Sequence, residues 1–366
     1  MSFDIRPRRP LNIFKPLDVT NQTLSHDHKN GYLYAEMYTK PKSMIYSTGK
    51  NADTLTKNNE LTDDLHKTWI IKSLISQGCH GCVYRATALS QSVIQESAIK
   101  YPRRIDKNKK KKARKIEDIR MSFRNEVNIY KKMMSNNPCK FIAKLLSSGS
   151  SPDGNRFLVL EYCSKNPDYY KQLSKMKILL NSIDLLSALE FIHIRNILHC
   201  DIKKDNVIYT FDGTVKLTDF SLAETINPNT LIDSNIAMGW LSFTSFSTFK
   251  GTLDYVGRDA HLGRYTYRSD MDSFLFLFLE WYLGMDKFPW SLNDTICNCF
   301  KGNLTLINSY TYTKKTMSIL DLVDDASETI PPFKEMFEGV WLSHYCDKFN
   351  YNRLKNNLLK CITQHK

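Results

Sequence analysis

The sequence predicts an α+β fold with two lobes, in which a small β-rich lobe precedes a larger α-helical lobe. Apolar runs with strand character come first, at residues 69–71, 82–86, 97–100 and 157–160, and the chain after them has mostly helical periodicity. Strands that precede helices along a chain favour a sheet and a helical layer that are largely separate. With 42% hydrophobic residues, the 366-residue chain can bury a core for both parts.

The chain is expected to divide into an N-terminal extension at residues 1–68, a first lobe at residues 69–163 and a second lobe at residues 164–366. The extension is polar, rich in Asn, Lys, Ser and Thr, and shows no sustained apolar period, so we expect most of it to be disordered. A charge run at residues 106–115 is expected to form a solvated loop, and residues 121–134 after it have helical character.

The composition is strongly basic, with a formal charge of +13. This balance suits acidic partners, namely nucleic acid, chromatin, an anionic membrane or acidic substrates, but a well-solvated basic surface explains it equally well. No run of about 18 apolar residues occurs and the N-terminus has no apolar segment, so we expect neither a membrane span nor a secretory signal. The nine cysteines are scattered, and no second C-x2-C pair accompanies Cys79 and Cys82 to complete a zinc-type set, which suits reduced intracellular thiols.

The first candidate site element is the glycine loop SQGCHGCV, which has the pattern G-x-G-x-x-G-x-V with serine at the first glycine position. Gly78 and Gly81 allow backbone N–H groups to approach phosphates closely, and Val83 follows on the next strand. Lys100 ends a predicted strand from which it can reach phosphates, and Glu126 on the next helix can pair with it. Each feature alone is weak, because strand turns and solvated helix glutamates are common.

The strongest signal is the segment HCDIKKDN, which begins at His199 and matches the pattern H-x-D-x-K-x-x-N. In phosphoryl transfer a protein holds phosphates, neutralises charge and aims the acceptor hydroxyl. Asp201 can accept the hydroxyl proton, Lys203 can neutralise the γ-phosphate, and Asn206 can hold a metal ion. Asp219, in the segment TDFS, is a second metal ligand, and two oxygen ligands on neighbouring loops suit Mg²⁺. The ordered set predicts a phosphotransferase that uses ATP and Mg²⁺.

With these motifs in order, the sequence resembles the eukaryotic protein kinases from about residue 69 to about residue 362. More narrowly, it is similar to the casein kinase 1 group, nearest to the vaccinia-related kinase branch. The narrow resemblance rests on GTLDY at residues 251–255 and DAHLG at 259–263, a stretch that replaces the A-P-E signature of other kinases, and on RSDMDS at 268–273. The resemblance implies the bilobal protein-kinase fold and transfer of the γ-phosphate of ATP to Ser or Thr of protein substrates.

The resemblance also assigns roles to further residues. Thr252 is expected beside the catalytic aspartate and lysine, where it helps to select Ser and Thr acceptors. Asp270 is expected to hold the backbone of the catalytic loop. Leu160 is the expected gatekeeper, and the backbone from Glu161 to Cys163 is expected to bind adenine.

Three residues depart from the family pattern. Ser76 replaces a glycine of the phosphate loop and stiffens its tip. Cys200 replaces the usual arginine, so a phosphorylated activation loop lacks its cationic partner there. Ser221 replaces the glycine after Asp219-Phe220, which restricts flips of that segment. None of the three removes a group that contacts phosphate or metal, so they bear on turnover more than on competence.

Two other interpretations of the motifs stay open. A pseudokinase or scaffold of the same fold would lack the lysine, the catalytic aspartate or the metal aspartate, and all three are present. A small-molecule phosphotransferase of related fold would usually lack the counterparts of Lys203 and Thr252. The basic run Lys107–Lys115 is a nuclear-import signal, a docking patch for polyanions or chromatin-associated partners, or only a solvated insertion. We expect a monomer in the nucleus or cytoplasm, with the nucleus favoured.

Overall fold

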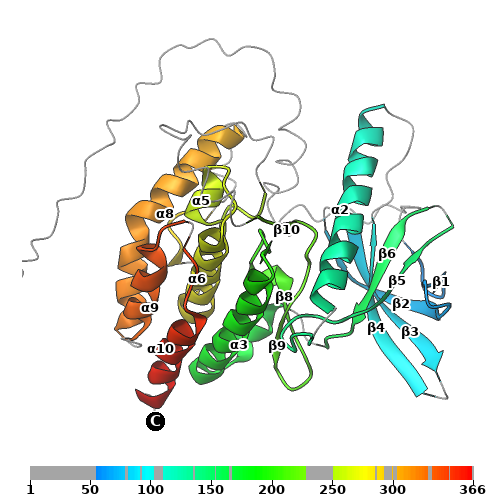
Figure 1. The fold of residues 1–366 in the computed structure, drawn as a ribbon, viewed down its shortest axis with the longest axis horizontal. Coiled ribbons are helices and arrows are strands. Elements are labelled where there is room, and N and C mark those ends of the chain that lie inside the picture. Colours follow the sequence, from blue (N-terminus) through cyan, green and yellow to red (C-terminus); the bar gives the residue numbers. More distant parts are fainter. Residues whose placement is uncertain are drawn as a thin grey trace, which may run out of the picture.

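The computed structural model describes the chain from residue 55 to residue 364 with interruptions. The stretches that it leaves out within this range are residues 79–80, 91–92, 103–109, 135–136, 153, 165–166, 228–249, 285–286, 292–298, 300–302, 329–331 and 346. Figure 1 shows a sheet with helix α2 beside it in one part of the molecule and a group of helices in the other. The two-lobe α+β architecture predicted from the sequence is therefore confirmed.

The sheet of the first lobe has six antiparallel strands in the order β1-β2-β3-β4-β6-β5. Its inner face carries a core of buried side chains that includes Trp69, Tyr84, Ile99 and Phe157. The strands span Glu60–Thr62 (β1), Thr68–Gln77 (β2), Gly81–Ser90 (β3), Val93–Pro102 (β4), Leu145–Ser150 (β5) and Arg156–Glu161 (β6).

The start of the sheet corrects the boundary expected at residue 68. Leu61 of β1 is buried in the sheet core, and its backbone pairs with Trp69 of β2. Asp63 after β1 is also buried, where it accepts hydrogen bonds from the indole of Trp69 (2.8 Å) and from the hydroxyl of Ser147. Residues 55–68 therefore belong to the folded lobe; β1 is too short to show a period in the sequence. Residues 1–54 of the expected extension lie outside the described residues.

Helix α2 (Lys110–Met134) corrects a second expectation, because it begins within the charge run that was expected to be a loop. Lysine, alanine and arginine are good helix formers, so charge alone does not make such a run a loop. Residues 107–109 lie outside the described part. Further along α2, Phe123, Tyr130 and Met133 are fully buried and share a core with Leu158 of β6, which fixes the helix against the sheet.

The second lobe is built around helix α6, which is buried on all sides. Every side chain from Phe274 to Leu279 is at most 1% exposed. Such a helix forms the centre of its layer. No helix within the described residues is long and apolar enough to cross a membrane. The elements span Pro167–Gln172 (η1), Lys175–Ile194 (α3), Ile197–Leu198 (β7), Lys204–Asn206 (η2), Val207–Tyr209 (β8), Val215–Leu217 (β9), Glu224–Thr225 (β10), Arg258–His261 (α5), Tyr267–Leu283 (α6), Leu304–Ser327 (α8), Pro332–Trp341 (α9) and Tyr351–Gln364 (α10).

Candidate active site

Asp270, in the first turn of α6, holds the loop between β7 and β8 through hydrogen bonds. The carboxylate of Asp270 accepts the backbone N–H groups of His199 (2.7 Å) and Cys200 (2.9 Å) and contacts the imidazole of His193 (3.0 Å). Asp270 is 1% exposed, so these contacts are shielded from water. They hold Cys200 in a left-handed conformation (φ 63°), which non-glycine residues adopt only when their surroundings impose it.

Three polar side chains meet at Asp201. The hydroxyl of Thr252 donates to Asp201 Oδ1 (2.8 Å), while Lys203 Nζ donates to Asp201 Oδ2 (2.7 Å) and to the Thr252 hydroxyl (2.9 Å). Asn206 Nδ2 also donates to Asp201 Oδ2 (3.0 Å). Burial lowers the pKa of Lys203, but the carboxylate of Asp201 outweighs it and leaves that pKa raised. The cluster therefore presents an oriented carboxylate beside a fixed cation.

A second cluster joins the two lobes through Lys100. Lys100 Nζ lies 2.7 Å from Glu126 Oε2 on α2 and 2.8 Å from Asp219 Oδ1 on the loop after β9. The ion pair between Lys100 and Glu126 expected from the sequence is therefore present. Burial lowers the pKa of Lys100, but Asp219 and Glu126 outweigh it and raise it above its usual value. Burial raises the pKa of Glu126, an effect that Lys100 opposes.

The chain after Asp219 is also fastened to helix α2, by contacts that the sequence did not reveal. The Ser122 hydroxyl donates to the carbonyl of Ser221 (3.0 Å), and the Asn125 amide donates to the carbonyl of Ala223 (2.8 Å). The Ser221 hydroxyl in turn donates to Asp219 Oδ1 (2.6 Å), a contact that glycine at this position could not make. Serine here therefore orients the aspartate as well as restricting the backbone.

Comparison with known proteins identifies the family of the chain. A family model described as the protein kinase domain matches residues 69–344, which is most of the chain. The chain belongs to the protein kinase family. It is similar to the mitosis inhibitor protein kinase mik1 of Schizosaccharomyces pombe, with 28% identity over 224 residues that cover 57% of this chain and 36% of that protein. It is also similar to a probable serine/threonine-protein kinase of Dictyostelium discoideum, with 27% identity over 272 residues, 67% of this chain and 54% of that protein.

The chain thus spans only about a third to a half of the length of these curated relatives. Among solved structures, it resembles vaccinia related kinase 3, with a TM-score of 0.61 and 22% identity over 92% of this chain and 96% of that chain. At this identity the likeness supports the fold alone.

The glycine loop of the kinase domain lies between β2 and β3. Gly78 N–H donates to the carbonyl of Gly81 (2.8 Å), and Val83 pairs with Lys100 across the ladder of β3 and β4. A Cβ atom on Gly81 would lie 2.5 Å from the carbonyl oxygen of Tyr101, whereas one on Gly78 would meet nothing nearer than 3.8 Å. The glycine at position 81 is therefore required by packing on β4. Phosphate approach, the role predicted for both glycines, stays a prediction.

The segment between the lobes begins at Leu160, which is buried, as a gatekeeper position requires. Glu161 turns its carboxylate away from the cleft, to Lys216 Nζ (2.5 Å) and to the backbone N–H of Lys144 (2.7 Å). Its backbone N–H donates to the carbonyl of Lys144 (2.9 Å), and the role of this backbone in binding adenine stays a prediction. Burial raises the pKa of the Cys163 thiol to about 12, so this cysteine stays protonated at neutral pH.

The residues predicted to hold a divalent cation fit a hard-cation site. Asn206 turns its amide nitrogen to the backbone carbonyl (2.8 Å) and carboxylate of Asp201, so its amide oxygen is the atom left to coordinate a cation. The carboxylate of Asp219 supplies a second oxygen donor. Within the described residues no group of three or more His, Cys, Asp or Glu side chains gathers at one point. Two protein ligands suit Mg²⁺, which takes its other ligands from phosphate and water.

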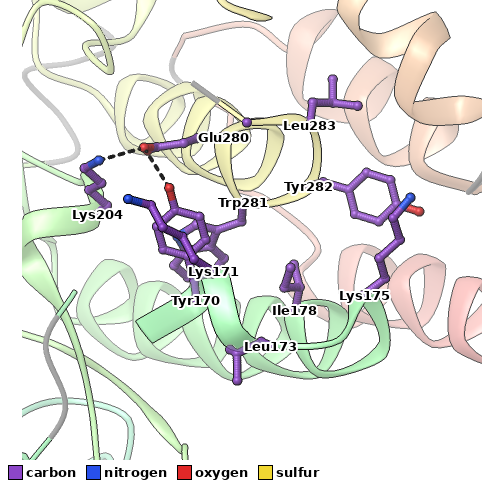
Figure 2. A pocket seen from close by; sticks show the side chains of 11 residues that line it. Tyr170, Lys171, Leu173, Lys175, Ile178, Lys204, Glu280, Trp281, Tyr282 and Leu283 are labelled. Atoms are coloured by element: carbon purple, nitrogen blue, oxygen red, sulfur yellow. Dashed lines mark hydrogen bonds and ion pairs between the residues drawn. The ribbon is translucent and has the colours of Figure 1, made fainter. Parts of the chain in front are cut away.

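A cavity of about 490 Å³ opens beside the catalytic loop, and Figure 2 shows the side chains around it. Glu280 of α6 lies at one edge and is fully buried; it pairs with Lys204 (3.1 Å) and accepts a hydrogen bond from Tyr170 (3.3 Å). Lys171 and Lys175 line the same cavity. Two of the three lysines that line the cavity are ion-paired, since Lys204 pairs with Glu280 and Lys171 pairs with Asp168 (3.1 Å).

Proposed function

We propose that this protein kinase domain transfers the γ-phosphate of ATP to Ser or Thr residues of protein substrates. The contact of Asp201 with both Thr252 and Lys203 is the observation that carries this proposal. A pseudokinase would be missing at least one group of the set, and Lys100, Asp201 and Asp219 all make ordered contacts here.

Each of the site residues has one physical task in this proposal. Asp201 accepts the proton of the acceptor hydroxyl, because its carboxylate is oriented by three donors and faces a cation rather than a second acid. Lys203 balances the charge that develops on the transferred group. Lys100 holds the phosphates of ATP, and its two carboxylate partners keep its side chain extended toward the cleft.

Mg²⁺ bound by Asn206 and Asp219 would neutralise the phosphate oxygens during transfer. The backbone from Glu161 to Cys163 would bind adenine, and Gly78 would let the backbone of its loop approach the phosphates. Thr252, which lies against the catalytic aspartate, favours a hydroxyl on a short side chain as the acceptor. The segments at residues 251–255 and 259–263 further support a place in the casein kinase 1 group.

The cavity beside the catalytic loop supports a protein acceptor rather than a small molecule. Lys204, which lines it, follows Asp201 by three residues, so a chain whose hydroxyl reaches Asp201 can continue into it. The cavity is open and lined by aromatic and charged side chains, which suits a peptide segment.

The test is a phosphotransfer assay with radiolabelled ATP and Mg²⁺ on casein, histone and basic protein mixtures. Asp201→Asn should lower kcat by on the order of 10² or more, because it removes the group that orients and deprotonates the hydroxyl, while the KM for ATP changes little. Asp212→Asn is the matched control, since Asp212 is exposed in the turn between β8 and β9 and should keep full turnover. Phosphoamino-acid analysis identifies the acceptor. Wild-type turnover of Asp201→Asn would refute the assignment.

A further inference from the structure

Lys315 of helix α8 is a lysine whose side chain is fully buried, at 0% exposure. Its Nζ donates to the backbone carbonyls of Leu253 (2.6 Å) and Val256 (2.7 Å) and lies 3.3 Å from Nε2 of His261. The ring of Phe276 from α6 covers the ammonium at 4.6 Å. Burying a lysine is costly unless every donor finds a partner, so this arrangement calls for a reason.

The three contacts fit the three N–H donors of an ammonium ion. Asn308 Nδ2 donates to the backbone carbonyl of His261 (2.9 Å), so its Oδ1, 2.6 Å from His261 Nδ1, accepts the ring proton there. His261 Nε2 is then an acceptor, and burial together with Lys315 lowers the pKa of His261 so that it stays neutral. Burial lowers the pKa of Lys315 well below its usual value, although Asp254 and Asp272 oppose the shift; the three acceptors around Nζ are the geometric reason to treat the group as an ammonium ion. A neutral amine has only two N–H groups and would leave one of the three acceptors without a donor.

The two carbonyls that Lys315 binds belong to the turn that follows Thr252. Within this turn the carbonyl of Thr252 accepts the N–H groups of Tyr255 (2.9 Å) and Val256 (2.8 Å). The carbonyls of Leu253 and Val256 instead accept from Lys315 of α8. Lys315 thus joins both ends of the turn through a single atom, and the turn cannot shift without breaking a charge-assisted hydrogen bond.

The side chains of the turn are anchored in the same direction. Leu253 and Val256 are buried with Ala260 of α5 and Ile307 of α8 in a small core of their own. Figure 1 shows α8 lying alongside α5 and α6, so this small core lies among the helices of the second lobe. At the front of the turn, only the Thr252 hydroxyl makes the contacts to Asp201 and Lys203 described above.

We propose that Lys315 is a positioning residue for phosphoryl transfer, because its ammonium fixes the turn that presses the Thr252 hydroxyl onto Asp201. This inference rests on the proposed function. Lys315 touches neither substrate nor metal, and its effect passes through Thr252. Loss of the ammonium leaves two buried carbonyls without a donor, and the turn moves to satisfy them. A displacement of about 1 Å at a positioning group costs on the order of 10²-fold in rate.

The test compares Lys315→Met with Lys314→Met in the full chain. Methionine matches the length of the lysine stem but donates no hydrogen bond, and Lys314 is the exposed neighbour on the same helix. Lys315→Met should lower kcat for the protein substrate by about 10-fold to 100-fold with the KM for ATP within about twofold. Lys314→Met should match the wild type. Thermal unfolding monitored by circular dichroism checks that each variant is folded.

A double-mutant cycle separates positioning from general damage to the fold. In a Thr252→Ala background, Lys315→Met should lower kcat by less than about twofold, because residues that act through one another are not additive. If Lys315→Met does not fold, Lys315→Gln replaces it in the same cycle, since its amide still donates to both carbonyls; it should retain an intermediate kcat and show the same loss of effect beside Thr252→Ala.

An equal loss in both backgrounds, or no loss in a folded variant, would overturn the inference. A kcat that is insensitive to both Asp201→Asn and Thr252→Ala would instead overturn the proposed function, so the two failures are distinguishable.

Discussion

Replacing Gly81 with alanine tests the conclusion that packing against β4 requires this glycine. The added Cβ would lie 2.5 Å from the Tyr101 carbonyl oxygen and 3.0 Å from Cζ of Phe123. The first contact is with backbone, so β3 and β4 must separate locally. Overpacking of this kind costs about 1–3 kcal/mol in the free energy of unfolding. For a domain of this size the melting temperature should fall by about 2–10 °C.

Gly78→Ala is the matched variant, because its Cβ would meet only the Gly81 carbonyl at 3.8 Å, an ordinary contact. Alanine in an unstrained position restricts the unfolded chain, so stability should stay level or rise by up to about 1 kcal/mol. This variant should raise the KM for ATP if its loop approaches phosphate. Differential scanning fluorimetry and ATP titration of both variants provide the measurements. Equal melting temperatures for Gly81→Ala and the wild type would refute the packing argument.

Three further results are expected. The free energy of unfolding should fall as the pH drops below about 6.5, by up to about 1.4 kcal/mol per pH unit for each buried histidine. The reason is that burial lowers the pKa values of His199 and His261, so the unfolded chain binds more protons than the folded chain. Urea unfolding from pH 7.5 to 5 measures this dependence, and a flat profile contradicts it. Phosphatase-treated enzyme should keep most of its initial rate, since the uncharged Cys200 side chain offers no cation to a phosphorylated loop; a loss that an upstream kinase restores would defeat this expectation. Changing Lys109, Lys110, Lys111 and Lys112 to Gln should abolish nuclear accumulation or low-salt heparin binding without altering activity on a short peptide; unchanged localisation and heparin binding would leave the run as a solvated insertion.

The residues of the candidate site were predictable because their spacing in the chain is short and their types are demanding. Asp201, Lys203 and Asn206 lie within six residues, and the structure brings Asp219 and Lys100 to the same cleft. A reaction that needs charge neutralised at fixed points limits which side chains can serve. The pairing of Lys100 with Glu126 also followed from their placement on neighbouring elements.

The supporting contacts were not predictable from the sequence. Ser122 and Asn125 are ordinary polar residues of a helix, and nothing in the pattern shows that the chain near Ser221 lies beside them. Lys315 follows another lysine in a polar stretch, which favours a solvated pair over one fully buried cation. Long-range contacts of this kind depend on tertiary packing, which the local periodicity of a sequence does not predict.

The fold was predictable where periods were long and not where elements were short or charged. The order of strands and helices followed from apolar runs, but β1 has only three residues, and pairing with β2 is what orders it. The charge before residue 116 favours a solvated loop, but the high helix propensity of these residues gives residues 110–115 a helical backbone. Helix propensity and polarity are separate properties, and a lysine-rich segment can be both helical and exposed to solvent.

Three lysine ammonium groups of the kinase domain lose water when the chain folds, so the free-energy cost of desolvating them falls on folding and not on the reaction. Lys100 lies between Glu126 and Asp219, Lys203 lies between Asp201 and Thr252, and Lys315 lies among backbone carbonyls. Each ammonium group is already held by its partners before a substrate binds, so no solvent has to reorganise around it during transfer. A cation held in this way cannot be exchanged for arginine without loss, because the guanidinium fork has a different shape and a different set of donors.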